Sequence, residues 1–118
     1  MAVYVDDMYL HPVGQFGRMK MSHLIADTDE ELHAMAARIG VARRWHQAPP
    51  RHDSHYDIAL TMRAKAITAG AIEISYRQCS LMTMVRRRTG SLPPPERAEA
   101  EWEAMRARAA LTPEEGRK

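Results

Sequence analysis

A helix that ends at a glycine and leads directly into a strand occurs twice in this chain, and this repeated junction constrains the fold most. Residues 29–39 and 58–69 are each predicted to be helical, and they end at Gly40 and Gly70. Glycine ends helices because it adopts the left-handed conformation without strain, and a β-type segment follows each of these two. The pattern predicts an α/β fold: a single small layered domain in which helices flank a short mixed or parallel sheet.

The other elements are predicted from capping residues and periodicity. Thr28 and Glu31 have the spacing of a capping box, in which Glu31 would reach back to the Thr28 amide and open the helix at 29–39. Asp57 is expected to be the N-cap of the helix at 58–69. Strands are expected at 3–5, 22–26, 41–45 and 71–75, and residues 8–20, which contain Pro12, Gly14 and Gly17, are expected to form a loop.

The three consecutive prolines at 93–95 divide the chain. We expect an α/β domain at 1–89, a proline-rich connector at 90–95, an appended amphipathic helix at 96–111 and a tail at 112–118. Ala98, Trp102, Met105 and Ala109 form one apolar stripe along that helix. Such a stripe needs a partner, which is either the body of the same domain or a second copy in a homodimer.

Composition excludes several classes of protein. With 118 residues, 45% hydrophobic and 27% charged, the chain fits one soluble globular domain. No apolar run approaches the roughly 20 residues of a membrane span, and no signal peptide is evident. The single Cys79 allows no internal disulfide, so a reducing cytoplasm is the expected location. A net charge of +2 does not by itself indicate nucleic-acid binding.

The candidate site begins with two adjacent aspartates, Asp6 and Asp7, at the end of the first predicted strand. Ligand sites in open α/β sheets form at the carboxyl ends of strands, and paired carboxylates near a core usually meet a positive group. Because neighbouring strand residues point to opposite faces, we expect only one of the two to face the site. We expect it to approach His55 or Asp57.

Further acid–base and metal-compatible residues lie near the predicted strand ends and helix starts. Asp27, His55 and Asp57 join Asp6 and Asp7 as candidate metal ligands, and His23 and His33 are candidates for acid–base catalysis or further ligands. Oxygen ligands mixed with imidazole suit a divalent ion: magnesium, manganese, iron or zinc. No spacing matches a known metal motif, and no glycine-rich phosphate loop is present.

Several of these residues also have purely structural explanations. Asp57 could serve as a helix cap, and His23 could be a hydrogen-bonded core histidine. Cys79 is expected to be a small packed residue, and the arginines at 86–88 a solvated helix end. Trp45 and Tyr56 are expected to pack in the core, although either could stack on a base.

Four motifs and several single residues, taken together, resemble a known family. They are Val-Tyr-Val-Asp-Asp-Met at 3–8, Ser-His-Leu-Ile-Ala-Asp-Thr at 22–28, Glu-Glu-Leu-His at 30–33, His-Tyr-Asp at 55–57, and Arg63, Ala66, Gly70 and Ala71. In these motifs the chain resembles a small family of bacterial and phage proteins classed as a domain of unknown function. The resemblance covers residues 3–75 and implies a bacterial or phage origin and a cytoplasmic setting. It implies no activity, cofactor or catalytic residue.

Two functional hypotheses follow. In the first, the protein is a small metal-dependent hydrolase acting on a phosphoester or nucleotide-like substrate, with the Asp and His residues above holding the ion. In the second, it is a non-catalytic binding or regulatory module for a nucleotide, nucleic acid or host protein, with structural histidines and arginines as its contact surface. The two differ in whether the Asp and His side chains converge within coordinating distance.

Overall fold

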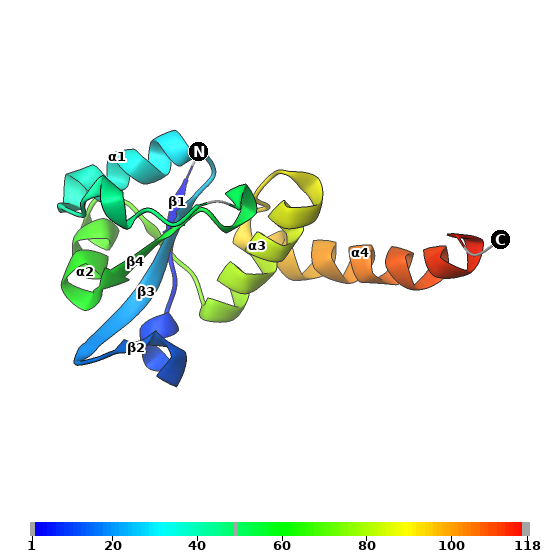
Figure 1. Ribbon diagram of the computed structural model, residues 1–118, viewed down its shortest axis with the longest axis horizontal. Helices are drawn as coiled ribbons and strands as arrows, with labels where there is room; N and C mark the ends of the chain where they lie inside the picture. The colour runs from blue at the N-terminus through cyan, green and yellow to red at the C-terminus, as the bar shows by residue number, and fades with distance from the viewer. Residues whose placement is uncertain (1, 49, 117–118) are drawn as a thin grey trace.

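The protein is a three-layer α/β domain with one helix extending from it, as the computed structural model of residues 2–48 and 50–116 shows (Figure 1). Helices α1 (Asp29–Ile39) and α2 (Leu60–Thr68) cover one face of the sheet. Helix α3 (Tyr76–Thr89) covers the other face, with the start of α4 (Pro95–Gly116) packed against it. The predicted α/β class is confirmed.

In the described residues the sheet is mixed and has five strands. These are β1 (Val3–Val5), β2 (Gln15–Phe16), β3 (Met19–Ala26), β4 (Tyr56–Ala59) and β5 (Ile72–Glu73). The order is β2-β3-β1-β5, and β4 also pairs with β3. The β1–β5 pair is parallel, and β3 is antiparallel to β1, β2 and β4. The central strand β3 therefore contacts three others, and its residues are the best placed to bring distant segments together.

Alternation along the strands divides the core into two parts. Val5, Leu24 and Tyr56 face α1 and α2, whereas Tyr4 and Ile25 face α3. The apolar side chains of α1 at helical spacing, which include Leu32 and Ile39, close the first core. Burial of these alternating faces fixes the register of the strands, because a slip of one residue would exchange the two faces.

The first helix begins and ends where its caps predict. The Thr28 hydroxyl accepts the Glu31 amide at 3.2 Å, and Gly40 ends α1 in the left-handed conformation with φ 87°. One detail differs from the expected capping box: the Glu31 carboxylate accepts a hydrogen bond from the Thr28 hydroxyl at 2.9 Å. The capping box with both hydrogen bonds occurs instead at α3, between Ser75 and Gln78.

Two predicted elements are wrong. Residues 41–45 form no strand, since Arg43–Trp45 is a 3-10 turn. Asp57 is not a helix cap but lies within β4, and α2 begins at Leu60 after Ala59, which makes no side-chain cap. The reason is the alternation of buried Tyr56 and Ile58, which pairs this segment with β3. The loop expected at 8–20 contains two 3-10 turns, Met8–Leu10 and Pro12–Gly14, and the hairpin formed by β2 and the start of β3.

The C-terminal helix docks on its own domain at its first turns. Ala98 is fully buried and Trp102 packs against the core beneath α3, as the apolar stripe predicts. The helix is longer than expected at both ends, and its later turns project away from the body (Figure 1). Of the tail expected at 112–118, residues 117–118 lie outside the described part. None of the helices in the described residues is long and apolar enough to span a membrane.

Candidate metal centre

Three neighbouring strands place Asp6, His23 and Asp57 in one row across the face of the sheet that α3 covers. In the register, Val5 pairs with Leu24, and His23 pairs with Asp57. Asp6 directly follows β1, and its amide donates to the His23 carbonyl at 3.1 Å, which continues the ladder by one residue. Residues 6, 23 and 57 are far apart in the sequence, and only strand pairing brings their side chains together.

Asp6 is fully buried, and its carboxylate is saturated with hydrogen bonds. Oδ1 accepts the amides of His23 at 2.8 Å and Met8 at 3.1 Å, and Oδ2 accepts the His23 Nδ1–H at 2.7 Å. Three donors compensate the loss of water around a buried carboxylate. With its proton on Nδ1, a neutral His23 presents a free electron pair on Nε2.

His55, which directly precedes β4, has the same arrangement. Its Nδ1 lies 2.5 Å from the carbonyl oxygen of Asp53, an acceptor only, so Nδ1 carries the proton and Nε2 is free when the ring is neutral. The rings of His23 and His55 meet edge to face, with centroids 4.9 Å apart. Both free nitrogens therefore belong to rings whose orientation is fixed by a hydrogen bond at the opposite nitrogen. This is the usual arrangement of histidines that bind metals.

Asp57 completes the cluster. Its Oδ1 lies 3.8 Å from His23 Nε2 and 3.4 Å from His55 Nε2, and its Oδ2 accepts the Gln47 side-chain amide at 3.0 Å. Oδ1 is buried and accepts no hydrogen bond from any described residue. A buried carboxylate oxygen without a donor is costly, so an additional positive partner would stabilise it.

The directions of the pKa shifts show that His55 and Asp57 interact with each other. Burial would lower the pKa of His55, but its contacts with Asp57 and Asp53 outweigh burial, and the pKa is raised. Burial would raise the pKa of Asp57, but its contacts with His55 and Gln47 outweigh burial, and the pKa is lowered. Asp57 therefore favours a positive charge beside it, which either a protonated His55 or a metal ion can supply.

Two sets of donor atoms in the described residues lie close enough to hold an ion. His23, His55 and Asp57 form one set, and Asp6, His23 and Cys79 form the other, with the donor atoms of each set within 4.8 Å of one another. The first set fits better, because both oxygens of Asp6 are already engaged and burial, followed by the nearby Asp6 carboxylate, raises the pKa of the Cys79 thiol well above its usual value. Two imidazoles and one carboxylate leave several coordination positions of a metal open.

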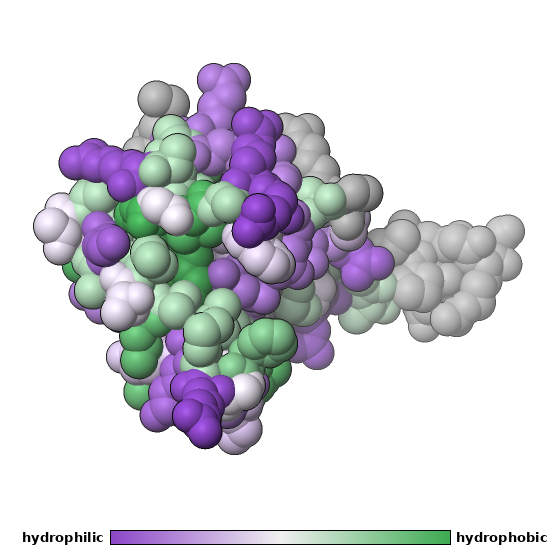
Figure 2. Space-filling view, turned by 60° about the vertical axis from the view of Figure 1, so that its left-hand side comes forward, coloured by the Kyte–Doolittle hydropathy of each residue, from purple (hydrophilic) through white to green (hydrophobic). Residues whose placement is uncertain are grey.

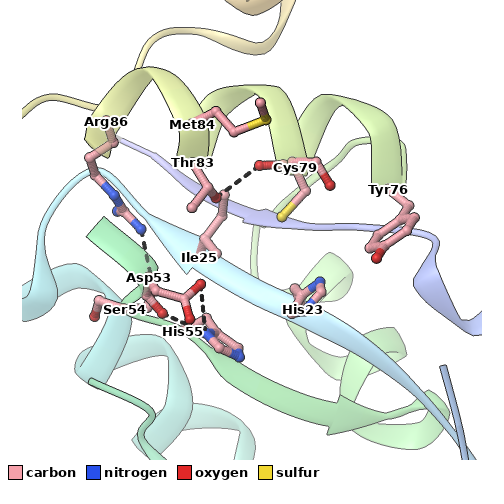
Figure 3. A pocket seen from close by; sticks show the side chains of 11 residues that line it. His23, Ile25, Asp53, Ser54, His55, Tyr76, Cys79, Thr83, Met84 and Arg86 are labelled. Atoms are coloured by element: carbon pink, nitrogen blue, oxygen red, sulfur yellow. Dashed lines mark hydrogen bonds and ion pairs between the residues drawn. The ribbon is translucent and has the colours of Figure 1, made fainter. Parts of the chain in front are cut away.

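A cavity of about 310 Å³ separates this cluster from α3, and His23 and His55 line its floor (Figure 3). Tyr76 stacks parallel to the His23 ring at 6.0 Å on one side. Cys79 points toward the sheet from the first turn of α3, and its burial confirms that it is a packed residue.

Arg86 contradicts the expectation of a solvated helix end. It is buried, and its guanidinium donates to the carbonyls of His52, Ala26 and Ser54, with distances of 2.6 to 3.4 Å. Arg86 thus connects α3 to the segment that leads into His55. Its role is structural, and sequence pattern alone could not distinguish it from its exposed neighbours Arg87 and Arg88.

Three of the expected site residues lie outside the cluster. Asp7 accepts the Tyr76 amide at 2.6 Å at the start of α3, in agreement with the expectation that only one of the two aspartates faces the site. Asp27 accepts the Ala2 amide at 2.8 Å. His33 lies on α1, across the sheet from His23, where its Nδ1 is 2.7 Å from the Tyr56 hydroxyl. Sequence reasoning missed the supporting roles of Gln47 and Asp53, which only the fold brings to the site.

Comparisons with known proteins place the chain in a family. No curated protein and no solved structure matches it. A family described as proteins of unknown function, DUF4031, matches residues 3–88, which is nearly all of the α/β body and leaves out α4. Since the match spans well over half of the sequence, the chain belongs to the DUF4031 family.

Proposed function

We propose that the protein is a small metal-dependent hydrolase whose ion is held by His23, His55 and Asp57. The observation that carries this proposal is the buried Oδ1 of Asp57, which lacks a hydrogen-bond donor among the described residues and faces the Nε2 atoms of both histidines. A divalent ion among these three atoms would satisfy the carboxylate and use both electron pairs. Asp6 supports the centre through His23 and is not itself a ligand in this proposal.

The three donor atoms narrow the choice of metal ion. Two imidazole nitrogens and one carboxylate oxygen suit zinc, iron(II) or manganese, whereas magnesium prefers oxygen ligands and water. Magnesium is therefore the weakest candidate of the four ions expected from the sequence.

The chemistry follows from the open positions of such an ion. A metal with three protein ligands lowers the pKa of a bound water toward neutrality and polarises a phosphoryl or carbonyl oxygen of a substrate. His23 and His55 line the cavity below α3, and Asp57 lines a separate groove, so the centre lies at a wall reached from two sides. A small phosphoester or nucleotide-like molecule is the substrate class that we propose.

Metal binding and turnover can be measured separately. Isothermal titration of the purified protein with zinc and manganese should give one site per chain, and bis(4-nitrophenyl) phosphate should be hydrolysed only by the loaded protein. Asp57→Asn and His23→Ala should lose both properties. His11→Ala, a half-exposed histidine outside the donor set, should keep both.

The same experiment distinguishes the hydrolase from the alternative, a binding or regulatory module. If the ion binds but a panel of phosphomonoesters, phosphodiesters and carboxylic esters is left intact, the centre is structural and the protein is a binding or regulatory module. If no ion binds, the metal centre itself is refuted. In that case His55 and Asp57 form an ion pair, which would also account for the opposite shifts of their pKa values.

The proposal extends to the setting of the protein. We also propose a bacterial or phage origin and a cytoplasmic location, and the location agrees with the free, buried Cys79. A homodimer through α4 is supported by its projecting later turns, where Leu111 is largely exposed (Figure 1). Size-exclusion chromatography with light scattering, comparing the full chain with Leu111→Glu, would test the dimer.

A further inference from the structure

An apolar groove lies beside the candidate metal centre. It has a volume of about 560 Å³ and lies between the hairpin, the turns after β1 and the 3-10 turn at Arg43–Trp45. Phe16 is 68% exposed and Trp45 is 59% exposed, which contradicts the expectation that Trp45 packs in the core. Hydrophobic side chains are also visible on the molecular surface in the space-filling view, between hydrophilic ones (Figure 2). The apolar lining consists of Met8, Val13, Phe16, Met19, Met21 and Trp45.

The groove shares one side chain with the candidate centre. Asp57 lines the groove, and Gln47, which donates to Asp57 Oδ2 at 3.0 Å, lines it as well. The other oxygen of Asp57 is the one that faces His23 and His55. A molecule that fills the groove therefore contacts the Asp57 side chain, whose carboxylate belongs to the candidate centre.

The dimensions and charge of the groove define what it accepts. Its volume lies within the range of small-molecule sites, on the order of 300–1,000 Å³, and is larger than an inorganic phosphate requires. None of the described residues that line it is cationic, and Asp57 is its single charge. The lining itself offers no cation to a phosphate group, so the groove suits the uncharged part of a ligand.

The aromatic side chains favour a flat ligand. The Arg44 guanidinium lies 5.3 Å from the centre of the Trp45 ring, a cation–π contact that holds this exposed ring in place. The thioethers of three methionines adapt to ligands of irregular shape. At Gly14 a Cβ would overlap the backbone of Met8 and Met21, so only glycine allows the turn to pack this closely beside the groove.

We infer that the groove binds a neutral aromatic body of the substrate, of naphthyl or nucleobase size, and directs its ester group to the His23, His55 and Asp57 centre. This inference rests on the proposed function for the position of the reacting group. It goes beyond that function by assigning the substrate an aromatic leaving or carrier group and by giving Phe16 and Trp45 the role of specificity residues.

Binding of 1-naphthol and turnover of 1-naphthyl phosphate by the zinc-loaded full chain test the inference. Titration calorimetry should show that 1-naphthol binds, and Phe16→Ala and Trp45→Ala should each weaken it on the order of tenfold, as expected for the loss of one stacked ring. Trp45→Phe should restore most of the affinity. Leu10→Ala, 65% exposed and outside the groove, should leave the affinity unchanged. Because these side chains are exposed, all four variants are expected to fold.

The outcomes separate the two proposals. If 1-naphthol binds in a Trp45-dependent manner but the ester is not hydrolysed, the groove is confirmed and the hydrolase fails. If the ester is hydrolysed with the same kcat/KM by wild type, Phe16→Ala and Trp45→Ala, the groove inference is overturned while the hydrolase stands. The inference is also overturned if 1-naphthol does not bind, or if Trp45→Ala instead converts a dimer into a monomer, because the groove would then be an interface between copies.

Discussion

Replacing Asp6 by asparagine tests whether the buried carboxylate prepares His23 for a metal ion. Asparagine keeps the shape but has only one oxygen, whereas Asp6 accepts from the amides of Met8 and His23 with one oxygen and from the His23 ring with the other. If the remaining oxygen stays on the two amides, the NH₂ group faces Nδ1 of His23, which must then accept. The proton moves to Nε2, the atom that faces Asp57.

The expected magnitude follows from this change of tautomer. Loss of a partner that orients a ligating histidine typically weakens metal binding by about 10- to 100-fold. At zinc one hundred times the wild-type Kd, binding stabilises the native state by about 2.7 kcal/mol. At roughly 4 °C per kcal/mol, this raises the Tm by about 10 °C. In Asp6→Asn the same zinc concentration leaves about 0.4–1.4 kcal/mol, a rise of about 2–6 °C.

The assay is differential scanning calorimetry of each variant with and without zinc. Asparagine at this position also weakens the apo protein by about 2 kcal/mol through lost charge-assisted hydrogen bonds, and the comparison within one variant cancels this loss. Asp27→Asn is the matched control, because Asp27 also accepts a backbone amide but lies outside the cluster. A wild-type zinc response in Asp6→Asn, or an equal loss in Asp27→Asn, would refute the reasoning.

Three further predictions concern other parts of the chain. Arg86→Lys should lower the free energy of unfolding, measured in urea, by about 2–3 kcal/mol, because lysine cannot donate to all the carbonyls that Arg86 binds. The control Arg87→Lys, at an exposed position, should change it by less than about 0.5 kcal/mol. Equal effects of the two substitutions would contradict the structural role of Arg86. Burial and then the positive charge of Arg43 lower the pKa of His33, so the unfolded chain binds more protons than the folded one. The free energy of unfolding should therefore fall as the pH drops below about 6.5. His33→Gln should remove this part of the pH dependence, and an unchanged pH dependence would contradict the prediction. Burial raises the pKa of the Cys79 thiol and shields it from solvent. Ellman's reagent should therefore modify Cys79 only as fast as the protein unfolds. Immediate reaction of the native protein would show instead that the thiol is accessible.

The elements that could be predicted from the sequence are those with local signals. Thr28 and Gly40 delimit α1 because a hydroxyl cap and a left-handed glycine act on the residues next to them. Asp57 misled the prediction because an aspartate before an apolar run is typical of a helix start, and the four residues of β4 are too few to show their alternation clearly.

Only the part of the candidate site formed by residues close together in the sequence could be predicted. His55 and Asp57 are two residues apart on an extended segment, so their side chains share a face without further information. Joining Asp6 and His23 to them requires the pairing of β1, β3 and β4, which no local pattern specifies. For the same reason His33 was grouped with His23, although the sheet separates the two.

The row formed by Asp6, His23 and Asp57 exists only in the native alignment of the strands. If β3 slid by one residue against its neighbours, His23 would turn to the α1 side and an apolar or hydroxyl side chain would take its place. A metal ion could then be bound by at most two of its ligands, His55 and Asp57. Metal binding would therefore stabilise the misaligned sheet less than the native one. Metal binding would thus favour, during assembly of the sheet, the one alignment in which β3 presents His23 beside His55 and Asp57.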